Sequence, residues 1–300
     1  MSKTYAKVGG QAVIEGVMMK GTDCIATAVR QPNGKIVYRK RKILKDKFGL
    51  FEKPLIRGVF ALIEAMIIGM KELTFSAVQS GEEEEEEITD FQLGLTVFAS
   101  LSIGVSLFFL LPAFIGNFMK TDIMANIVEG IIRMSLFVLY VWLISFSKDI
   151  KRVFQYHGAE HKSIYTLEND EELTVENAKK YTTLHPRCGT SFLVIVMLIS
   201  MLVFSIVDMT ILRSDNFLIK TGIKFILRIA FLPFVAGIAY ELQRYSSNHL
   251  DNKIIKVLAT PGLWLQKITT SEPDEEQLEV GLVALKVALG REVKNAEEVN

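Results

Sequence analysis

An uncharged run of 29 residues, from Phe91 to Met119, constrains this chain more than any other feature of its sequence. At 1.5 Å per residue, a helix of that length measures about 44 Å, more than the roughly 30 Å hydrocarbon core of a bilayer. The mean hydropathy of the chain is +0.29, although 23% of its residues are charged. Apolar and charged residues are therefore segregated into blocks, which indicates an integral membrane protein with substantial soluble parts.

Three further apolar stretches complete a predicted bundle of four spans. Span one is Phe91–Met119, span two Ile123–Ser147, span three runs from Ser191 to about Leu212, and span four is Phe217–Tyr240. We expect a mainly α-helical membrane protein, a four-span helical bundle with an interfacial helix and a small N-terminal β element.

The composition excludes other classes of protein. A charged fraction near the average, together with half of the residues being apolar, excludes intrinsic disorder and collagen. Two cysteines, Cys24 and Cys188, cannot build a disulfide framework. The 34 Lys and Arg residues balance 34 Asp and Glu residues, which argues against a dedicated nucleic-acid binder.

Basic residues are concentrated on one side of the predicted bundle. Residues 1–90 hold 14 Lys and Arg, the 148–190 loop holds 7 and the segment after 241 holds 7, whereas the two hairpin tips hold only Lys120 and Arg213. Because basic loops stay in the cytoplasm, we expect a multi-pass protein of the cell membrane with both termini cytoplasmic.

Residues 54–79 are apolar almost all round, except that Arg57, Glu64 and Lys71 recur every seven residues as one charged stripe. The uncharged stretches between these charges are too short to span a bilayer. We expect an interfacial or re-entrant helix on the cytoplasmic side. The alternative is a fifth span, which would place the basic N-terminus outside.

These observations divide the chain into seven regions. They are a cytoplasmic β-rich region (1–53), the interfacial or re-entrant helix (54–79), an acidic linker (80–90), spans one and two (91–147), a cytoplasmic His/Cys loop (148–190), spans three and four (191–240) and a cytoplasmic C-terminal region (241–300).

The β-rich region contains a hairpin signal at Pro32-Asn33-Gly34. Before it, the β-prone segment Gly9–Met19 carries one carboxylate, Glu15, among glycines that permit a bulge or a close backbone approach. Glu15 is either a strand residue turned to water or a carboxylate held for a functional site.

Three of the four histidines fall in the 148–190 loop. The apolar period around His157 and His161 predicts a helix, on which residues four apart share one face. Two imidazoles so placed can bind one Zn²⁺ ion. Glu160 completes an H-x-x-E-H order and is the candidate catalytic base that activates a water molecule.

His185 and Cys188 lie three residues apart directly before span three. With His157 and His161 they would close a tetrahedral zinc shell, which is the structural arrangement, whereas a shell lacking one of the four is open and suits catalysis. Glu241, at the cytoplasmic end of span four, is a further candidate oxygen ligand. The competing interpretation is a set of buried, hydrogen-bonded histidines with a small apolar cysteine.

Charged residues within spans two and four form a second group: Glu129, Arg133, Lys220, Lys224 and Arg228. Charges inside a membrane usually face a partner or a wet cavity. They indicate either a path for an anionic solute or ion pairs such as Glu129 with Lys224 or Arg133.

Four blocks of sequence resemble the YqhQ-type bacterial membrane proteins. These blocks are GGQAVIEGVMM (9–19), YHGAEHK (156–162), HPRCGTSF (185–192) and EPD (272–274), and the resemblance covers nearly the whole chain. It implies a bacterial inner-membrane protein of unknown function with a predicted metal-dependent activity, and it implies no substrate.

The sequence therefore favours a polytopic cytoplasmic-membrane protein with a divalent metal, zinc by preference, at the cytoplasmic surface, and with metal-dependent hydrolysis as its activity. The first alternative is a non-enzymatic scaffold or regulator in which the metal or His/Cys cluster is structural. The second is a transporter of an anionic solute. The expected partners are the lipid bilayer and a protein or second copy of the chain, with no nucleic acid.

Overall fold

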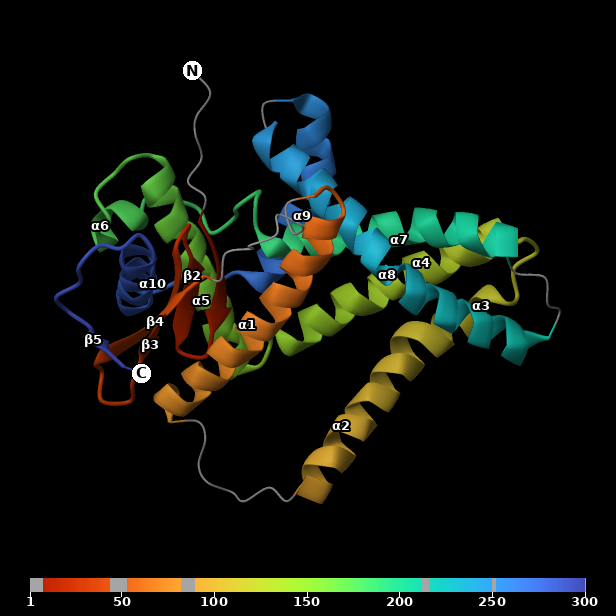
Figure 1. Cartoon of the computed structure of the whole chain (residues 1–300), viewed down its shortest axis with the longest axis horizontal. Helices are drawn as coiled ribbons and strands as arrows, with labels where there is room; N and C mark the ends of the chain where they lie inside the picture. Colours follow the sequence, from red (N-terminus) through yellow and green to blue (C-terminus); the bar gives the residue numbers. More distant parts are fainter. Residues whose placement is uncertain (1–7, 44–52, 82–89, 212–215, 250–251, 300) are drawn as a thin grey trace.

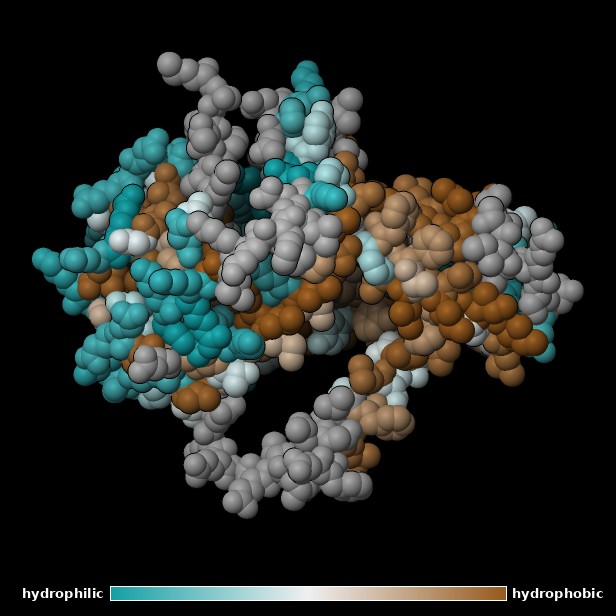
Figure 2. All heavy atoms as spheres, viewed as in Figure 1, coloured by the Kyte–Doolittle hydropathy of each residue, from teal (hydrophilic) through white to brown (hydrophobic). Residues whose placement is uncertain are grey.

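The computed structural model describes residues 8–43, 53–81, 90–211, 216–249 and 252–299. The chain forms a part built around a small β-sheet and a part built from long helices (Figure 1). Figure 2 shows hydrophilic residues over the first part and hydrophobic residues over the second. The predicted architecture, mainly helical with a small N-terminal β element, is confirmed.

The sheet is an antiparallel meander with one short added strand. Its order is β1 (Gly9–Val13), β2 (Gly16–Lys20), β3 (Cys24–Arg30), β4 (Ile36–Lys42) and β5 (Glu297–Glu298), and only the β4–β5 pair is parallel. The predicted turn at Pro32-Asn33-Gly34 joins β3 to β4. Gly34 has φ +84° there, a conformation that glycine adopts without steric cost.

The segment Gly9–Met19 is a hairpin, since β1 and β2 pair with each other. Glu15 lies at its tip with φ +49°, which is uncommon for a residue other than glycine. A Cβ atom at Gly16 would lie 2.3 Å from the carbonyl oxygen of Ala28 in β3. The glycine therefore allows the close backbone approach that the sequence suggested.

Helices cover both faces of the sheet. On one face α5 (Lys148–Glu168) and α10 (Glu275–Ala288) enclose the main apolar core. On the other face lies α1 (Ile56–Ser80), whose Phe75 packs with Val29 and Val37. A strand buried on both faces need not alternate apolar and polar residues, which explains the continuous apolar runs of β2 and β3.

Within the described residues, four helical segments are long and apolar enough to cross a membrane. The first comprises α2 (Asp90–Val105), the π-helical turn η2 (Ser106–Leu110) and α3 (Leu111–Gly116); the others are α4 (Asp122–Ile144), α7 (Gly189–Ile211) and α8 (Phe217–Asn248). They coincide with the four predicted spans, although α8 continues past Tyr240. In Figure 1 α2 extends away from the other three.

Two further helices complete the described chain. The short α6 (Val175–Ala178) contacts α5 and α10, and α9 (Lys253–Thr269) packs on α7 and α4. The glutamate run of the predicted acidic linker, 82–87, and Arg213 at a hairpin tip lie outside the described residues.

Candidate metal centre

Helix α5 and the start of α7 bring three candidate ligands together. His157 and His161 lie one turn apart on α5, whose predicted helical structure is confirmed, and Cys188 directly precedes α7. One ligand atom from each residue lies within 4.8 Å of the other two. The Nε2 atom of His157 is 3.1 Å from the Sγ atom of Cys188.

Backbone carbonyls set the orientation of both imidazoles. The Nδ1 atom of His157 lies 2.8 Å from the carbonyl oxygen of Thr269, and Nδ1 of His161 is hydrogen-bonded to the carbonyl oxygen of Thr183. A carbonyl only accepts hydrogen bonds, so each Nδ1 carries a proton, and Nε2 is the nitrogen that holds the lone pair in a neutral ring. Carbonyl partners of this kind commonly orient histidines that bind metals.

The Nε2 atom of His161 is buried and makes no hydrogen bond of good geometry among the described residues, although the Cys188 thiol lies near enough to influence the ring. The whole side chain is only 1% exposed. A buried polar nitrogen without a partner costs about 1–3 kcal/mol. A metal ion bound at this lone pair would remove that penalty.

The Cys188 thiol is prepared for ionisation. Burial raises the pKa of the thiol, but the neighbouring His161 and the hydroxyl and backbone N–H of Thr190 outweigh burial and hold the pKa below its ordinary value. The Thr190 hydroxyl donates to Sγ at 3.3 Å and its backbone N–H at 3.5 Å. Thiolate is the form of cysteine that binds metals.

His185, the fourth predicted ligand, does not belong to this convergent group. Its Nε2 atom faces the Glu168 carboxylate at 3.4 Å, and the backbone N–H of Arg187 donates to its Nδ1 at 3.4 Å. Burial lowers the pKa of His185 to about 4, so the ring is neutral at pH 7. The structure therefore gathers three of the four predicted ligands, and His185 lies outside that group.

Glu160 lies beside the three ligands in a fully buried position against β1. The backbone N–H of Gly10 donates to its carboxyl group, and a Cβ atom at Gly10 would lie 3.0 Å from the Glu160 carboxyl carbon. Burial raises the pKa of Glu160 to about 8; Cys188 acts in the same direction, while His157 and the Gly10 N–H oppose it. The carboxyl group is mostly protonated at pH 7 when no metal is bound.

Glu241 and Glu15 are both engaged in ion pairs. The Glu241 carboxylate accepts from the Arg57 guanidinium, at 2.6 Å from its Nε, and from the backbone N–H of Leu55. Glu15 accepts from the Arg152 guanidinium and, at 3.2 Å, from the Tyr156 hydroxyl. Glu241 thus links α8 to α1, and Glu15 links the first hairpin to α5.

Gly158 lets another segment reach the centre. A Cβ atom there would lie 2.2 Å from the carbonyl oxygen of Ser271, and the backbone N–H of Ser271 donates to the carbonyl of Phe154 at 2.9 Å. This close approach holds the end of α9, including the Thr269 carbonyl, against His157.

The charged residues of the long helices form a separate, paired cluster. Glu129 of α4 lies 2.8 Å from the Lys224 ammonium and 2.5 Å from the Arg228 guanidinium. Asp208 of α7 lies 3.2 Å from Lys224 and supplies a second carboxylate that the sequence analysis did not assign as a partner. This geometry corresponds to the ion-pair alternative.

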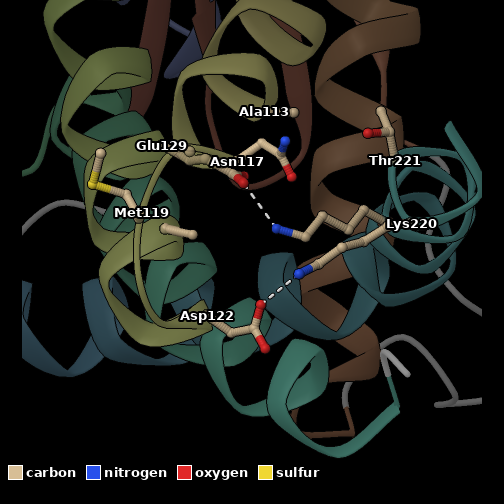
Figure 3. A pocket seen from close by; sticks show the side chains of 10 residues that line it. Ala113, Asn117, Met119, Asp122, Glu129, Lys220 and Thr221 are labelled. Atoms are coloured by element: carbon tan, nitrogen blue, oxygen red, sulfur yellow. Dashed lines mark hydrogen bonds and ion pairs between the residues drawn. The ribbon is translucent and has the colours of Figure 1, made fainter. Parts of the chain in front are cut away.

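A small cavity opens toward the hairpin end of this cluster. Lys220 and Asp122 pair at 2.6 Å at one side of it and Glu129 and Lys224 pair at the other (Figure 3). Its volume is about 40 Å³, room for about three water molecules.

Arg133 has no carboxylate within ion-pair distance among the described residues, and instead its Nε donates to the carbonyl oxygen of Phe108 at 3.0 Å. That carbonyl precedes Pro112 by four residues, and proline has no N–H to offer it. Arg133 therefore satisfies the backbone group that the proline leaves free, next to the π-helical turn η2.

Two comparisons relate the chain to known proteins. The sequence profile of a family described as "Protein of unknown function (DUF1385)" matches residues 53–291. "Uncharacterized protein YqhQ" from Bacillus subtilis (strain 168) is 36% identical over 294 residues, covering 91% of this chain and 89% of that protein. No solved structure matches the chain significantly.

Proposed function

This chain belongs to the DUF1385 family of proteins of unknown function, and we propose that it is a multi-pass cytoplasmic-membrane protein with a metal-dependent hydrolytic centre at its cytoplasmic surface. The resemblance to YqhQ-type proteins is confirmed by the 36% identity. Because no relative supplies an activity, the proposal rests on the chain's own residues.

One observation carries the metal assignment. The two imidazoles present their Nε2 lone pairs and Cys188 its sulfur to one small space, within 4.8 Å of one another. Two nitrogens and one thiolate form a donor set that suits Zn²⁺, and three protein ligands are typical of catalytic rather than structural zinc sites. The position of His185, turned toward Glu168, supports the open arrangement.

The residues around the open position support hydrolysis. A zinc ion bound there would act as a Lewis acid and make a water molecule more acidic. Glu160 is the proton-transfer group, since a carboxyl group with a pKa near working pH can both accept and release a proton. The charge of a bound cation would lower that pKa toward neutrality.

The membrane orientation is part of the proposal. The four apolar helices support insertion, and the distribution of Lys and Arg supports cytoplasmic termini. We assign α1 to the cytoplasmic membrane surface, because its outward face exposes Ile63, Met66, Ile67 and Met70. Membrane-impermeant labelling of cysteines introduced at Asn33 and Lys286 tests it; labelling of intact cells at Asn33 would contradict this orientation.

The activity is tested with Glu160→Gln, which keeps the shape of the side chain and replaces the ionisable carboxyl group by an amide that does not titrate. We expect purified Glu160→Gln protein to retain its metal. We expect the same variant, expressed in a deletion strain, to fail to complement it. Loss of metal equal to that of His161→Ala would make Glu160 a ligand. Retention of both metal and complementation would favour the scaffold or regulator over the enzyme.

A further inference from the structure

Helix α9 has one exposed face with a distinctive composition. At 100° per residue, Lys253, Val257, Thr260, Trp264 and Lys267 project within a sector of about 80°, with Lys256 at its edge. All of these except the half-buried Thr260 are exposed. The helix contains no Asp or Glu, so this face is both apolar and basic.

The opposite face of α9 fixes the level of the helix in the molecule. Leu265 packs with Val141, in the last turn of α4, and with Val194, near the start of α7. A Cβ atom at Gly262 would lie 2.4 Å from the hydroxyl oxygen of Ser191, so α9 and α7 are in close contact. Helix α9 therefore lies where two candidate spans end on the side of the metal centre.

Both tryptophans of the chain lie at this level. Trp142 follows Val141 in α4 and is 47% exposed, and Trp264 precedes Leu265 in α9 and is 63% exposed. Exposed tryptophans are typical of the membrane–water interface, where an apolar ring with one polar N–H is well solvated. Two such rings beside one packing contact are consistent with a single interfacial level at this end of α4 and α9.

The three lysines of α9 have no carboxylate within ion-pair distance among the residues that the structure places. Lysine side chains at a membrane surface extend their charged ends to the phosphate layer while their stems cover apolar surface. Anionic phospholipids attract such basic helices. The face thus matches a headgroup layer in both its apolar centre and its charge.

We infer that the exposed face of α9 is a binding surface for anionic phospholipid headgroups, with Val257 and Trp264 entering the membrane boundary and Lys253, Lys256 and Lys267 contacting phosphates. This inference rests on the proposed membrane insertion and not on the metal centre.

The inference has a consequence for the metal centre, because α9 also positions residues there. The Thr269 carbonyl orients His157. The Gln266 side chain accepts from the backbone N–H of His185 at 2.7 Å and donates to its carbonyl oxygen at 2.8 Å. The metal centre is thereby held at the lipid surface, within reach of membrane-borne substrates.

Each tryptophan can be made the sole reporter of its position. In Trp142→Phe protein the fluorescence comes from Trp264, and in Trp264→Phe protein it comes from Trp142. Full-length protein is placed in nanodiscs containing lipids brominated near the carbonyl end of their acyl chains, either phosphatidylglycerol or phosphatidylcholine. All discs contain the same mixture of the two lipids and therefore the same charge, and only the brominated lipid differs between them. We expect at least a twofold loss of Trp264 fluorescence when phosphatidylglycerol is brominated and a clearly smaller loss when phosphatidylcholine is brominated.

Adding Lys253→Gln and Lys256→Gln should remove this preference for phosphatidylglycerol. The matched control is Lys40→Gln with Lys294→Gln, which removes the same charge from exposed positions on the β-sheet side and should leave the preference intact. Equal quenching by both lipids in the Trp264 reporter would overturn the anionic selectivity.

The two reporters separate failure of this inference from failure of membrane insertion. If Trp142 is quenched and Trp264 is not, the α9 surface binds something other than lipid, such as a second copy of the chain, and the inference is overturned while insertion stands. If neither is quenched, the proposed insertion itself is wrong.

Discussion

The Nε2 atom of His157 lies 3.1 Å from the Sγ atom of Cys188, across 31 residues of chain. The contact joins α5, which belongs to the sheet layer, to the residue directly before an apolar helix, α7. The two atoms converge because the Thr269 carbonyl accepts a hydrogen bond from Nδ1 of His157 and the Thr190 hydroxyl donates to the sulfur. Three segments distant in sequence therefore determine one ligand geometry, and each can be tested separately.

We predict that the protein purifies with about one zinc-like ion per chain. His157→Ala, His161→Ala or Cys188→Ala should each reduce the metal content at least tenfold, whereas His185→Ala should retain most of it, because the His185 ring faces Glu168. Metal analysis by mass spectrometry measures this, with His249→Ala, an exposed histidine outside the cluster, as the control. A loss in His185→Ala as large as in His161→Ala would restore the four-ligand, structural site.

The substitution Gly158→Ala should destabilise the protein, although alanine favours a helix by about 1 kcal/mol over glycine. The new Cβ atom would meet the Ser271 carbonyl oxygen at 2.2 Å, and overpacking of this kind costs about 1–3 kcal/mol. Metal affinity should fall as well, because the Thr269 carbonyl moves with Ser271.

Thermal unfolding in detergent and metal titration test this prediction. Gly222→Ala in α8 is the matched control, because no other segment of the described residues comes within 4 Å of its added Cβ. A wild-type melting temperature and metal affinity in Gly158→Ala would show that the packing at Ser271 is not required.

The buried charges should act as a structural lock between α4, α7 and α8. Glu129→Gln would leave Lys224 and Arg228 with Asp208 as the one carboxylate near both among the described residues. Removing one partner of a buried pair costs about 3–5 kcal/mol. In a double-mutant cycle with Lys224→Met, we expect a coupling free energy of about 1–3 kcal/mol.

Unfolding by denaturant in micelles measures these free energies. Asp122→Asn, which removes the more exposed partner of Lys220, is the control and should cost about 1 kcal/mol or less. Negligible destabilisation by Glu129→Gln would instead favour a cluster that exists for solute passage.

Features that depend on local chain properties were predictable from the sequence. The four long helices follow from hydropathy averaged over neighbouring residues, and the shared face of His157 and His161 follows from helical geometry. Gly10, one of the glycines of Gly9–Met19, was recognised as a place where another segment could approach closely. In the structure a Cβ atom at Gly10 would lie 2.6 Å from the carbonyl oxygen of Met18 and 3.0 Å from the Glu160 carboxyl carbon.

Features that depend on distant packing were not predictable. Whether His185 belongs to the same ligand group as Cys188 depends on Glu168, because the Glu168 carboxylate is the hydrogen-bond partner of the His185 Nε2 atom. The irregular turn from His185 to Cys188 has no sequence period from which this pairing could be predicted. The pairing of Asp208 with Lys224 was not predictable either, because the relative level of helices in a bundle is set by their packing. The carbonyls of Thr183 and Thr269 leave no signal in a sequence, since every residue has one.

The last prediction concerns pH and the metal-free protein. Burial raises the pKa of Glu160 to about 8, well above the roughly 4.3 of an unfolded chain. Between these values the folded protein binds one proton more than the unfolded chain, so the free energy of unfolding falls as pH rises, by at most about 1.4 kcal/mol per pH unit. With a chelator present, the melting temperature should therefore drop between pH 6 and pH 8, and the melting temperature of Glu160→Gln should drop less.

Glu279→Gln is the control for this prediction, because the pKa of Glu279 lies below its ordinary value. Burial opposes this shift, and the Arg30 and Asn295 hydrogen bonds outweigh it. Glu279 stays ionised over the whole range, so its variant should keep the wild-type drop. An equal drop in wild type and Glu160→Gln would mean that Glu160 does not titrate in this range, and its role in proton transfer at neutral pH would lose its physical basis.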